Sequence, residues 1–233
     1  MERTRHVCVA LFGGTGERFG APYPKQFVLL DDEPMILVTL KALIACPDID
    51  EIYIVTEPKT RDQVYSLVME HRLHKIEGIL NGGATRQESS RLAMEFLLGV
   101  GVPRDAIVLI CDGDRPCVDP DLVHRCYAKA EECGAAVTAI PMTESVLLGD
   151  KEGNVDRYLD RDYVYAVQTP QAFRFSLIYR AHMKFADKRV TDDASLVTYL
   201  GKPVGIVAGS RDNIKITVPQ DVDTYRTWKT KVS

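Results

Sequence analysis

The first segment that could do chemistry is a loop in which glycines and positive charges occur together. The apolar run HVCVALF (residues 6–12) leads directly into GGTGERFGAPYPKQF (residues 13–27). Closely spaced glycines allow backbone N–H groups to approach an anion, and an arginine and a lysine add positive charge. The residues concerned are Gly13, Gly14, Gly16, Arg18 and Lys25. We therefore expect this loop to bind phosphate, although a simple turn between a strand and a helix would also contain glycine.

The loop matches neither of two common phosphate-binding patterns. A P-loop ends in Gly-Lys-Ser/Thr, whereas Lys25 stands well past the glycines. A dinucleotide fingerprint needs G-x-G-x-x-G and a following helix. Here Gly14-x-Gly16-x-x-x-Gly20 has a different spacing, and two prolines oppose the helix. The loop is therefore expected to bind the phosphates of some other ligand.

Two further segments place charged groups at the ends of expected strands. AIVLICD (residues 106–112) continues into GDRP, so that Asp112 ends the apolar run and Asp114 follows it. Carboxylates beside a phosphate loop are typical Mg²⁺ ligands. We predict that Asp112 binds metal or substrate, and that Asp114 serves in the loop or caps a helix. Lys215, in NIKITV (residues 213–218), is interpreted as a strand lysine that faces either a pocket or solvent.

Strand-like and helix-like segments alternate along the chain and must position these groups. Strands are expected at 6–12, 51–57, 76–80, 106–112, 135–142, 203–210 and 213–218. Helices are expected at 34–46, 61–73, 85–100, 120–134, 176–186, 192–201 and 219–232. This alternation predicts an α/β fold with a parallel, doubly wound sheet. Ligands of such sheets bind beyond the carboxyl ends of the strands, and four exits here carry both glycine and charge.

The alternation breaks between Pro141 and Gln168. Two strand-like runs flank DKEGN (residues 150–154), which predicts a β-hairpin inserted as an arm at about 141–168. A hairpin on its own is marginally stable in water, so we expect the arm to pack on a second copy of the chain. Residues 1–233 are otherwise expected to form a single domain.

Composition excludes several classes of function. The 233 residues are 45% hydrophobic and carry a net charge of −4, which argues against a general nucleic-acid binder. No secretory signal is visible, and no apolar run is long enough to span a membrane. The six cysteines lack CxxC spacing, so we expect reduced thiols in a cytoplasmic protein and no zinc site. None of the five histidines is assigned a catalytic role, and packing or surface roles are expected for all of them.

Six segments, taken in order, resemble a known family. They are GGTGERFGAPYPKQF, GGATRQES, DGDRPCV, QTPQAF, TDDASLV and DNIKIT. Together they are similar to the cytidylyltransferases that activate sugar-alcohol phosphates, above all the 2-C-methyl-D-erythritol 4-phosphate cytidylyltransferases of non-mevalonate isoprenoid synthesis. A near relative is the ribitol-5-phosphate cytidylyltransferase family of teichoic-acid and capsule synthesis. The resemblance implies a Rossmann-like nucleotidyltransferase core, a homodimer with swapped β-arms, CTP, Mg²⁺, and transfer of CMP with release of pyrophosphate.

The resemblance also implies roles for single residues. Arg18, Lys25 and Lys215 match the family's catalytic cations, which would stabilise charge on the α-phosphate and on the leaving pyrophosphate. The nucleotide would be bound by the first glycines (Gly13, Gly14 and Gly16) together with Gly83, Arg86 and Ser89. The acceptor would be bound by Asp112, Arg115, Ser145, Arg161 and Thr169, with Asp112 also at the metal. Arg161 and Thr169 match arm residues that reach into the partner subunit's site.

Several departures from the family pattern bear on the acceptor. Cys111–Gly113 stands where the family usually has His-Asp-Ala, and Glu144-Ser145 stands where it has Asp-Thr. Val146 to Leu148 replaces a stretch that often begins with lysine in the erythritol-phosphate enzymes, and Ala84 replaces a common acidic residue. TDDAS favours the erythritol-phosphate branch, whereas PKQF and NIKIT favour the ribitol-phosphate branch. We predict the erythritol-phosphate activity, with ribitol 5-phosphate as the alternative acceptor.

Two other functions share features with this sequence. A nucleotidyltransferase that makes a UDP- or ADP-sugar could begin with a similar glycine loop, but QTPQAF, NIKIT and the short chain oppose it. A non-catalytic nucleotide-binding scaffold could keep the fold, but it would not need to keep Arg18, Lys25 and Lys215 together.

Overall fold

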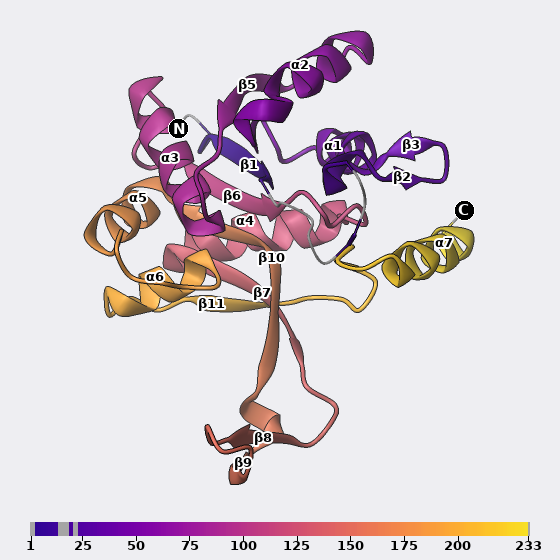
Figure 1. The fold of residues 1–233 in the computed structure, drawn as a ribbon. Coiled ribbons are helices and arrows are strands. Elements are labelled where there is room, and N and C mark those ends of the chain that lie inside the picture. Colours follow the sequence, from indigo (N-terminus) through magenta and orange to yellow (C-terminus); the bar gives the residue numbers. More distant parts are fainter. Residues whose placement is uncertain (1–2, 14–18, 21–22, 233) are drawn as a thin grey trace.

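A seven-stranded mixed sheet forms the centre of the molecule (Figure 1). The computed structural model describes residues 3–13, 19–20 and 23–232. The strand order is β11-β7-β10-β6-β1-β4-β5. The strands are β1 (His6–Phe12), β4 (Glu51–Thr56), β5 (Ile76–Asn81), β6 (Ile107–Asp112), β7 (Ala135–Pro141), β10 (Tyr165–Arg174) and β11 (Gly205–Ala208).

One strand departs from the predicted parallel arrangement. β10 lies between β6 and β7 and pairs with both in the antiparallel sense, whereas the other neighbours in the sheet are parallel. The predicted parallel sheet is therefore confirmed for the other neighbouring strands and wrong for β10. Residues 165–168, assigned to the arm from sequence, pair with β7 as part of this strand. The chain leaves β7, forms the arm and returns directly, and such a connection produces antiparallel neighbours.

Helices cover both faces of the sheet. Every residue of β1 is therefore buried, and its alternate side chains pack into two different cores. Cys8 and Ala10 pack with α1 (Met35–Ala45), α2 (Arg61–Glu70) and α4 (Pro120–Cys133). Val7 and Val9 pack with α3 (Arg86–Gly99), α5 (Phe175–Lys184) and α6 (Asp193–Tyr199). A smaller third core joins α7 (Gln220–Val232) to the β2–β3 hairpin (Leu29–Leu30 and Glu33–Pro34).

The ends of two helices follow signals that are visible in the sequence. Thr85 caps α3 by accepting a hydrogen bond from Glu88 N, and the Glu88 carboxylate in turn accepts one from Ala84 N at 2.7 Å. The helix α4 begins after Asp119 with a proline in its first turn and ends at Gly134, whose φ of 89° favours glycine. The predicted boundaries of α3 and α4 are therefore confirmed to within a residue.

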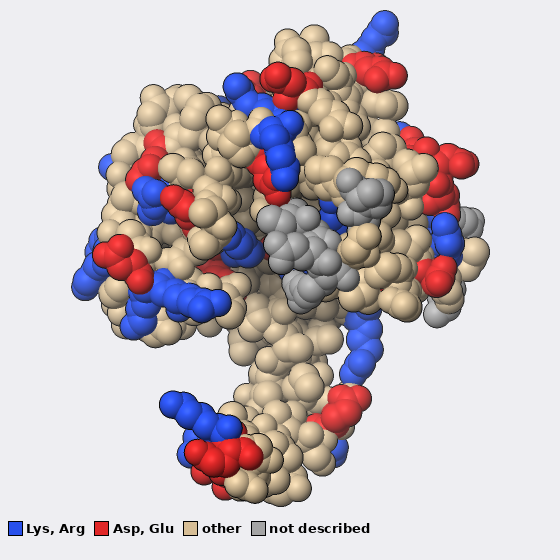
Figure 2. All heavy atoms as spheres, viewed as in Figure 1, with Lys and Arg blue, Asp and Glu red and all other residues tan. Residues whose placement is uncertain are grey.

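The predicted arm is a separate antiparallel hairpin, β8 (Val146–Gly149) and β9 (Val155–Leu159). It projects from the body at the end of β7 and β10 (Figure 1). Its side chains are largely exposed, including Leu147 at 43% and Tyr158 at 69%, which face each other across the hairpin. Figure 2 shows that its tip also carries both acidic and basic residues. Within one chain, this apolar surface is left uncovered.

Residues 213–218, predicted as a strand, form no regular element. Their backbone groups have partners outside any ladder: Ile216 N donates to Asp114 O, and Thr217 N and Val218 N donate to the Asp221 carboxylate. The β-branched composition of this segment reflects burial of Ile216 rather than strand pairing. Lys215 is therefore a loop residue.

The six cysteines are free thiols, as expected, and five of them are buried. Cys8 Sγ and Cys111 Sγ lie 3.9 Å apart on neighbouring strands without a covalent bond. Within the described residues, every helix is too short or too polar to cross a membrane.

Candidate active site

The predicted meeting of four strand exits is confirmed by a chain of alternating charges at one edge of the sheet. Lys25, in the 3₁₀ turn Lys25–Phe27 after β1, donates to Asp114 Oδ2 at 2.5 Å and to Ile216 O at 2.8 Å. Lys215, in the loop after β11, donates to Asp112 Oδ2 at 2.7 Å and lies 3.8 Å from Asp114 Oδ1. Two lysines that are 190 positions apart in numbering (215 − 25) thus share one pair of carboxylates.

The chain of charges continues through Arg86, the first residue of α3, which follows the exit of β5. Arg86 Nε donates to Asp112 Oδ1 at 2.9 Å, and Arg86 Nη1 donates to Asp193 Oδ2 at 2.6 Å. Behind it, His182 Nε2 lies 3.1 Å from Asp193 Oδ1. His182 and Asp193 are at most 1% exposed at their side chains. The arrangement therefore extends from the surface at Lys215 to the core between α5 and α6.

Two carboxylates of this cluster, those of Asp112 and Asp193, are held in the ionised form. Burial by itself would raise the pKa of Asp112, but the charges of Arg86 and Lys215 outweigh it and lower the pKa to about 2. Burial would likewise raise the pKa of Asp193, yet Arg86 and the bond from His182 hold it well below its usual range. Because its two carboxylate partners outweigh desolvation, the pKa of Arg86 is raised. Ionised groups in fixed positions form a preorganised field for a charged ligand.

Asp112 is also held from the backbone side by β10. Its N–H donates to Thr169 Oγ1 at 3.0 Å, and Asn213 Nδ2 donates to Thr169 O at 2.8 Å. Arg115 Nη1 donates to Asn213 O at 2.6 Å, and its Nε lies 4.0 Å from Asp112 Oδ2. Burial lowers the pKa of Arg115. The predicted residues Asp112, Arg115 and Thr169 therefore belong to one buried hydrogen-bonded group.

The position of Thr169 corrects the expectation drawn from the resemblance. Thr169 was expected among the arm residues that reach a partner subunit, but its hydroxyl accepts from Asp112 N of its own chain. It lies there because β10 brings it into the centre of the sheet beside β6. Asp114 lies in the loop after β6, as one of the two predicted alternatives has it, and its carboxylate also pairs with Lys25.

The predicted nucleotide loop after β5 is closed by its own hydrogen bonds. Gly83 N donates to Ser89 Oγ at 3.1 Å, and the same hydroxyl donates to Thr85 O at 2.9 Å. A Cβ on Gly13 would lie 3.5 Å from Ser89 Oγ, so the exits of β1 and β5 adjoin. Gly14, Gly16 and Arg18 lie outside the described residues. Of the predicted nucleotide residues that are described, Gly13, Gly83, Arg86 and Ser89 thus occupy one corner of the site.

Ser145 and Arg161 are not brought to this cluster. Both are exposed residues of the arm, which projects away from the sheet edge (Figure 1). Arg161 Nη1 donates to Thr143 O at 3.0 Å, a bond that stays within the arm. If these two residues bind the acceptor, they must act at a site outside their own chain's cluster.

The carboxylates fit a metal ion only together with a ligand. Among the described residues, no group of three or more His, Cys, Asp or Glu side chains could hold a metal by itself. Asp112 and Asp114 supply two carboxylates, and Asp114 Oδ1 is buried without a hydrogen-bond partner in the described chain. Mg²⁺ is commonly bound by one or two carboxylates plus substrate phosphates, so the pair fits Mg²⁺ bound with a nucleotide.

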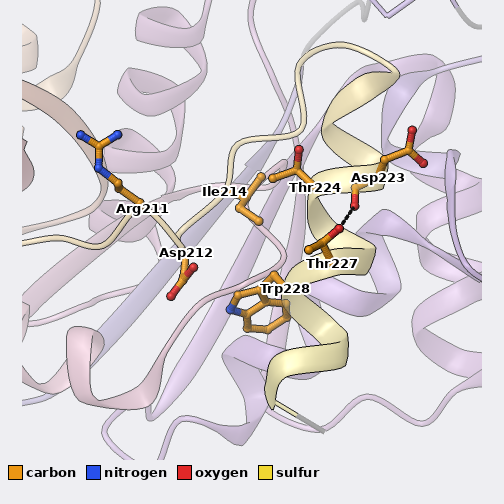
Figure 3. A pocket seen from close by; sticks show the side chains of 7 residues that line it. All are labelled: Arg211, Asp212, Ile214, Asp223, Thr224, Thr227 and Trp228. Atoms are coloured by element: carbon orange, nitrogen blue, oxygen red, sulfur yellow. Dashed lines mark hydrogen bonds between the residues drawn. The ribbon is translucent and has the colours of Figure 1, made fainter. Parts of the chain in front are cut away.

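A separate pocket of about 350 Å³ lies outside the charged cluster (Figure 3). Arg211 and Asp212 border it from the loop after β11, and Asp223 and Trp228 border it from α7. None of the predicted site residues that the structure describes lines this pocket.

Sequence reasoning missed three members of the site. Asp193 lies within the quoted TDDASLV segment but was given no role, and His182 was expected only to pack or to face solvent. Nothing in the sequence marked Asn213 as a site residue except that it stands two positions before Lys215. Spacing alone could not reveal them, because their partners lie 107, 11 and 44 positions away.

Comparison with known proteins places this geometry in a family. The profile of "IspD: 2-C-methyl-D-erythritol 4-phosphate cytidylyltransferase" matches residues 6–227. A 2-C-methyl-D-erythritol 4-phosphate cytidylyltransferase of Syntrophus aciditrophicus is 38% identical, covering 93% of this chain and 92% of that protein. A ribitol-5-phosphate cytidylyltransferase of Lacticaseibacillus paracasei is 31% identical, covering 95% and 97%. The crystal structure of 4-diphosphocytidyl-2C-methyl-D-erythritol synthase from Anaerococcus prevotii matches with a TM-score of 0.83 at 26% identity, covering 97% and 99%.

These matches define the class of protein as a CTP-dependent nucleotidyltransferase. More closely, the chain belongs to the IspD family of cytidylyltransferases. The resemblance stated from the sequence is confirmed, and family membership favours a cytidylyltransferase over a UDP- or ADP-sugar enzyme or a scaffold.

Proposed function

We propose that this protein transfers CMP from CTP to 2-C-methyl-D-erythritol 4-phosphate and releases pyrophosphate, a step of non-mevalonate isoprenoid synthesis. The observation that carries the proposal is the convergence of Lys25 and Lys215 on Asp112 and Asp114, in a chain that matches the family profile over residues 6–227. The relative that is 38% identical is named for this acceptor.

In the proposed reaction, a phosphate oxygen of the acceptor attacks the α-phosphorus of CTP. The bond from that phosphorus to the oxygen bridging the β-phosphate breaks, and pyrophosphate leaves with the electron pair. Negative charge grows on the α-phosphoryl oxygens and on the leaving group. Lys25 and Lys215 would stabilise this charge, and their bonds to the two aspartates keep them in place before the substrate arrives. Arg18 would add a third cation.

The remaining residues would bind the two substrates. Gly13, Gly83 and Ser89 would face the nucleotide together with Gly14, Gly16 and Arg86, as the family resemblance implies. Asp112, with Asp114 beside it, would hold Mg²⁺, which supplies positive charge that screens the triphosphate. Arg115 and Thr169 would border the acceptor next to Asp112.

A homodimer formed through the arm is part of the proposal. Exposed apolar side chains of the hairpin need a covering surface, and a second copy of the chain would supply it. Ser145 and Arg161 would then bind the acceptor phosphate in the partner's site, where the planar fork of an arginine suits a phosphate. The exposed position of Arg161 in the projecting arm supports this arrangement.

We also propose a cytoplasmic location. Free thiols persist in reducing compartments, and Cys8 and Cys111 remain unbonded although their sulfur atoms lie 3.9 Å apart.

Ribitol 5-phosphate is the second candidate acceptor. The relative named for it is 31% identical over nearly its whole length. The altered arm sequence Glu144-Ser145 lies in the region proposed to bind the acceptor.

The experiment is to measure pyrophosphate release with CTP and Mg²⁺, side by side with each of the two polyol phosphates. We expect a higher kcat/KM with 2-C-methyl-D-erythritol 4-phosphate, and much less activity when UTP, ATP or GTP replaces CTP. Preference for ribitol 5-phosphate would instead assign the protein to teichoic-acid or capsule synthesis. CTP binding without activity on either acceptor would contradict both acceptors.

A further inference from the structure

A buried pair of residues supports Arg86 from the side opposite the reacting groups. Asp193 lies in the first turn of α6, and His182 lies on α5. Their side chains are 1% and 0% exposed, so neither can touch a substrate. The transfer reaction proposed above assigns no task to either residue.

Two carboxylates hold the guanidinium of Arg86 from different sides. Its Nε bonds to Asp112 Oδ1 and its Nη1 bonds to Asp193 Oδ2, so carboxylates from β6 and α6 hold two edges of the planar guanidinium. Charge-assisted bonds of this kind are stronger and more directional than neutral ones. With both bonds made, the guanidinium has one defined orientation. Without Asp193, it would be held by Asp112 alone.

His182 completes the support of Asp193. Its Nε2 lies 3.1 Å from Asp193 Oδ1, while the other carboxylate oxygen is left to Arg86. His182 Nδ1 has no hydrogen-bond partner among the described residues, so the ring meets Asp193 through Nε2. Because the ionised carboxylate of Asp193 can only accept, Nε2 carries the proton of this bond. The histidine therefore donates to the carboxylate and fixes its rotation.

Arg86 connects this support to the nucleotide loop. It is the first residue of α3, directly after the loop that Gly83 and Ser89 close, and its guanidinium reaches Asp112 at the end of β6. This side chain thus links the segment beside the nucleotide loop to Asp112. We infer that Asp193, fixed by His182, is a positioning residue that orients Arg86 and thereby raises the affinity of the site for CTP. This inference rests on the proposed function.

A purely local role for Asp193 is the competing explanation, because an acidic residue in the first turn of a helix stabilises that helix. The chain offers a matched control in Asp192. Its carboxylate lies at the same helix end and accepts from Gln171 Nε2 at 3.1 Å. None of its hydrogen bonds in the described chain goes to Arg86. A role in the helix alone predicts similar effects at both aspartates.

The test is isothermal titration of the full-length protein with CTP and Mg²⁺ in the absence of acceptor, with thermal denaturation measured in parallel. Asp193→Asn keeps the shape but removes the charge, and we expect the dissociation constant to rise roughly 10- to 100-fold, as for residues that orient a ligand-binding group. Asp192→Asn should change it by no more than about threefold. His182→Phe removes the donor and should weaken CTP about 3- to 10-fold. His182→Gln keeps a donor and should restore most of the affinity.

A double-mutant cycle separates positioning from general destabilisation. If Asp193 acts through Arg86, adding Asp193→Asn to Arg86→Gln should weaken CTP binding no further. Fully additive effects, or an Asp193→Asn protein that binds CTP like the unmodified protein, would overturn the inference and leave the proposed function standing. If Asp193→Asn does not fold, the two His182 variants decide: equal affinity in Phe and Gln would overturn it. An unmodified protein that binds no CTP would overturn both proposals.

Discussion

The charged edge of the sheet and the arm differ in how their side chains are shielded from water. At the sheet edge, Asp112, Asp114 and Asp193 each bond to a cation of the same chain, and most of the participating atoms are shielded from water. In the arm, Leu147, Tyr158 and Tyr163 expose between 43% and 83% of their surface. The charged groups of the first region pair within one chain, whereas the described residues leave the apolar surface of the second uncovered.

This difference shows what fixes the position of the side chains in each region. Buried charges must be paired, and the largely buried carboxylates of Asp112 and Asp114 hold Lys25 and Lys215 in place. A two-stranded hairpin gains little from its own contacts, so its position relative to any site depends on what it packs against. Changes at the sheet edge should therefore alter chemistry within one chain, and changes in the arm should alter assembly.

The largest effect is expected from Lys25→Ala. Removing one preorganised donor to a developing charge costs about 10²- to 10³-fold in kcat, because the lysine acts chiefly in the transition state. Steady-state pyrophosphate release with CTP measures it. Lys41→Ala removes an exposed lysine that pairs with Glu33 on the surface and should leave kcat unchanged. Equal activity of the Lys25 variant and the unmodified protein would remove this lysine from the mechanism.

Changes in the arm should act on assembly instead. Leu147→Asp combined with Tyr158→Asp places charge on both strands of the hairpin. If the proposed dimer forms through the arm, its dissociation constant should rise at least about 100-fold, because each side chain would lose apolar burial worth about 1.5–3 kcal/mol. Analytical ultracentrifugation measures it. Tyr65→Asp, at a tyrosine of α2 that is 57% exposed, should not change the association state.

The same comparison predicts complementation between two inactive proteins. If Arg161 serves the partner's site, a mixture of Lys25→Ala and Arg161→Ala chains should regain up to about a quarter of the unmodified activity through mixed dimers, the share expected from random pairing with one intact site per mixed dimer. Subunit exchange is confirmed first with differently tagged chains. No recovery after exchange would show that each site is built from one chain.

A smaller effect, on stability, is expected at Gly113, where close packing leaves no room for a side chain. A Cβ on Gly113 would lie 2.3 Å from Phe12 Cδ1, and that ring is buried. Gly113→Ala should therefore destabilise the protein by about 1–3 kcal/mol, measured by urea denaturation. Gly99→Ala meets nothing within 4 Å and should be neutral or slightly stabilising. In a Phe12→Leu background, the cost of Gly113→Ala should shrink if the clash with the ring is its cause.

Acid should weaken the sheet edge before the arm is affected. The pKa of Asp112 is lowered to about 2 in the folded protein from an ordinary value of 3.8. Its contribution of about 2 kcal/mol is therefore complete above pH 5 and is lost as the pH falls toward 2. The free energy of unfolding should fall less steeply with acid in Asp112→Asn than in the unmodified protein. Asp156→Asn, at an exposed residue of the arm, should leave the acid dependence nearly unchanged.

The sequence by itself determined the class of fold, most of the elements and the chemistry of the site. Helix signals such as Thr85 with Glu88, and Asp119 with Gly134, are local, and local signals survive without knowledge of the fold. The four strand exits could be recognised because parallel strands place their ends at one edge. The family could be recognised because its segments occur in order along the chain.

Only the tertiary structure decided which of these groups meet. β10 is antiparallel in the centre of the sheet because of how the chain returns from the arm, and that return brings Thr169 to Asp112. The segment around Lys215 is a loop because its backbone finds partners in Asp114 and Asp221 rather than in a strand. Asp193 and His182 acquire a role only where α5 and α6 pack beside Arg86. Contacts between distant positions leave no period or spacing in the sequence, so folding alone reveals them.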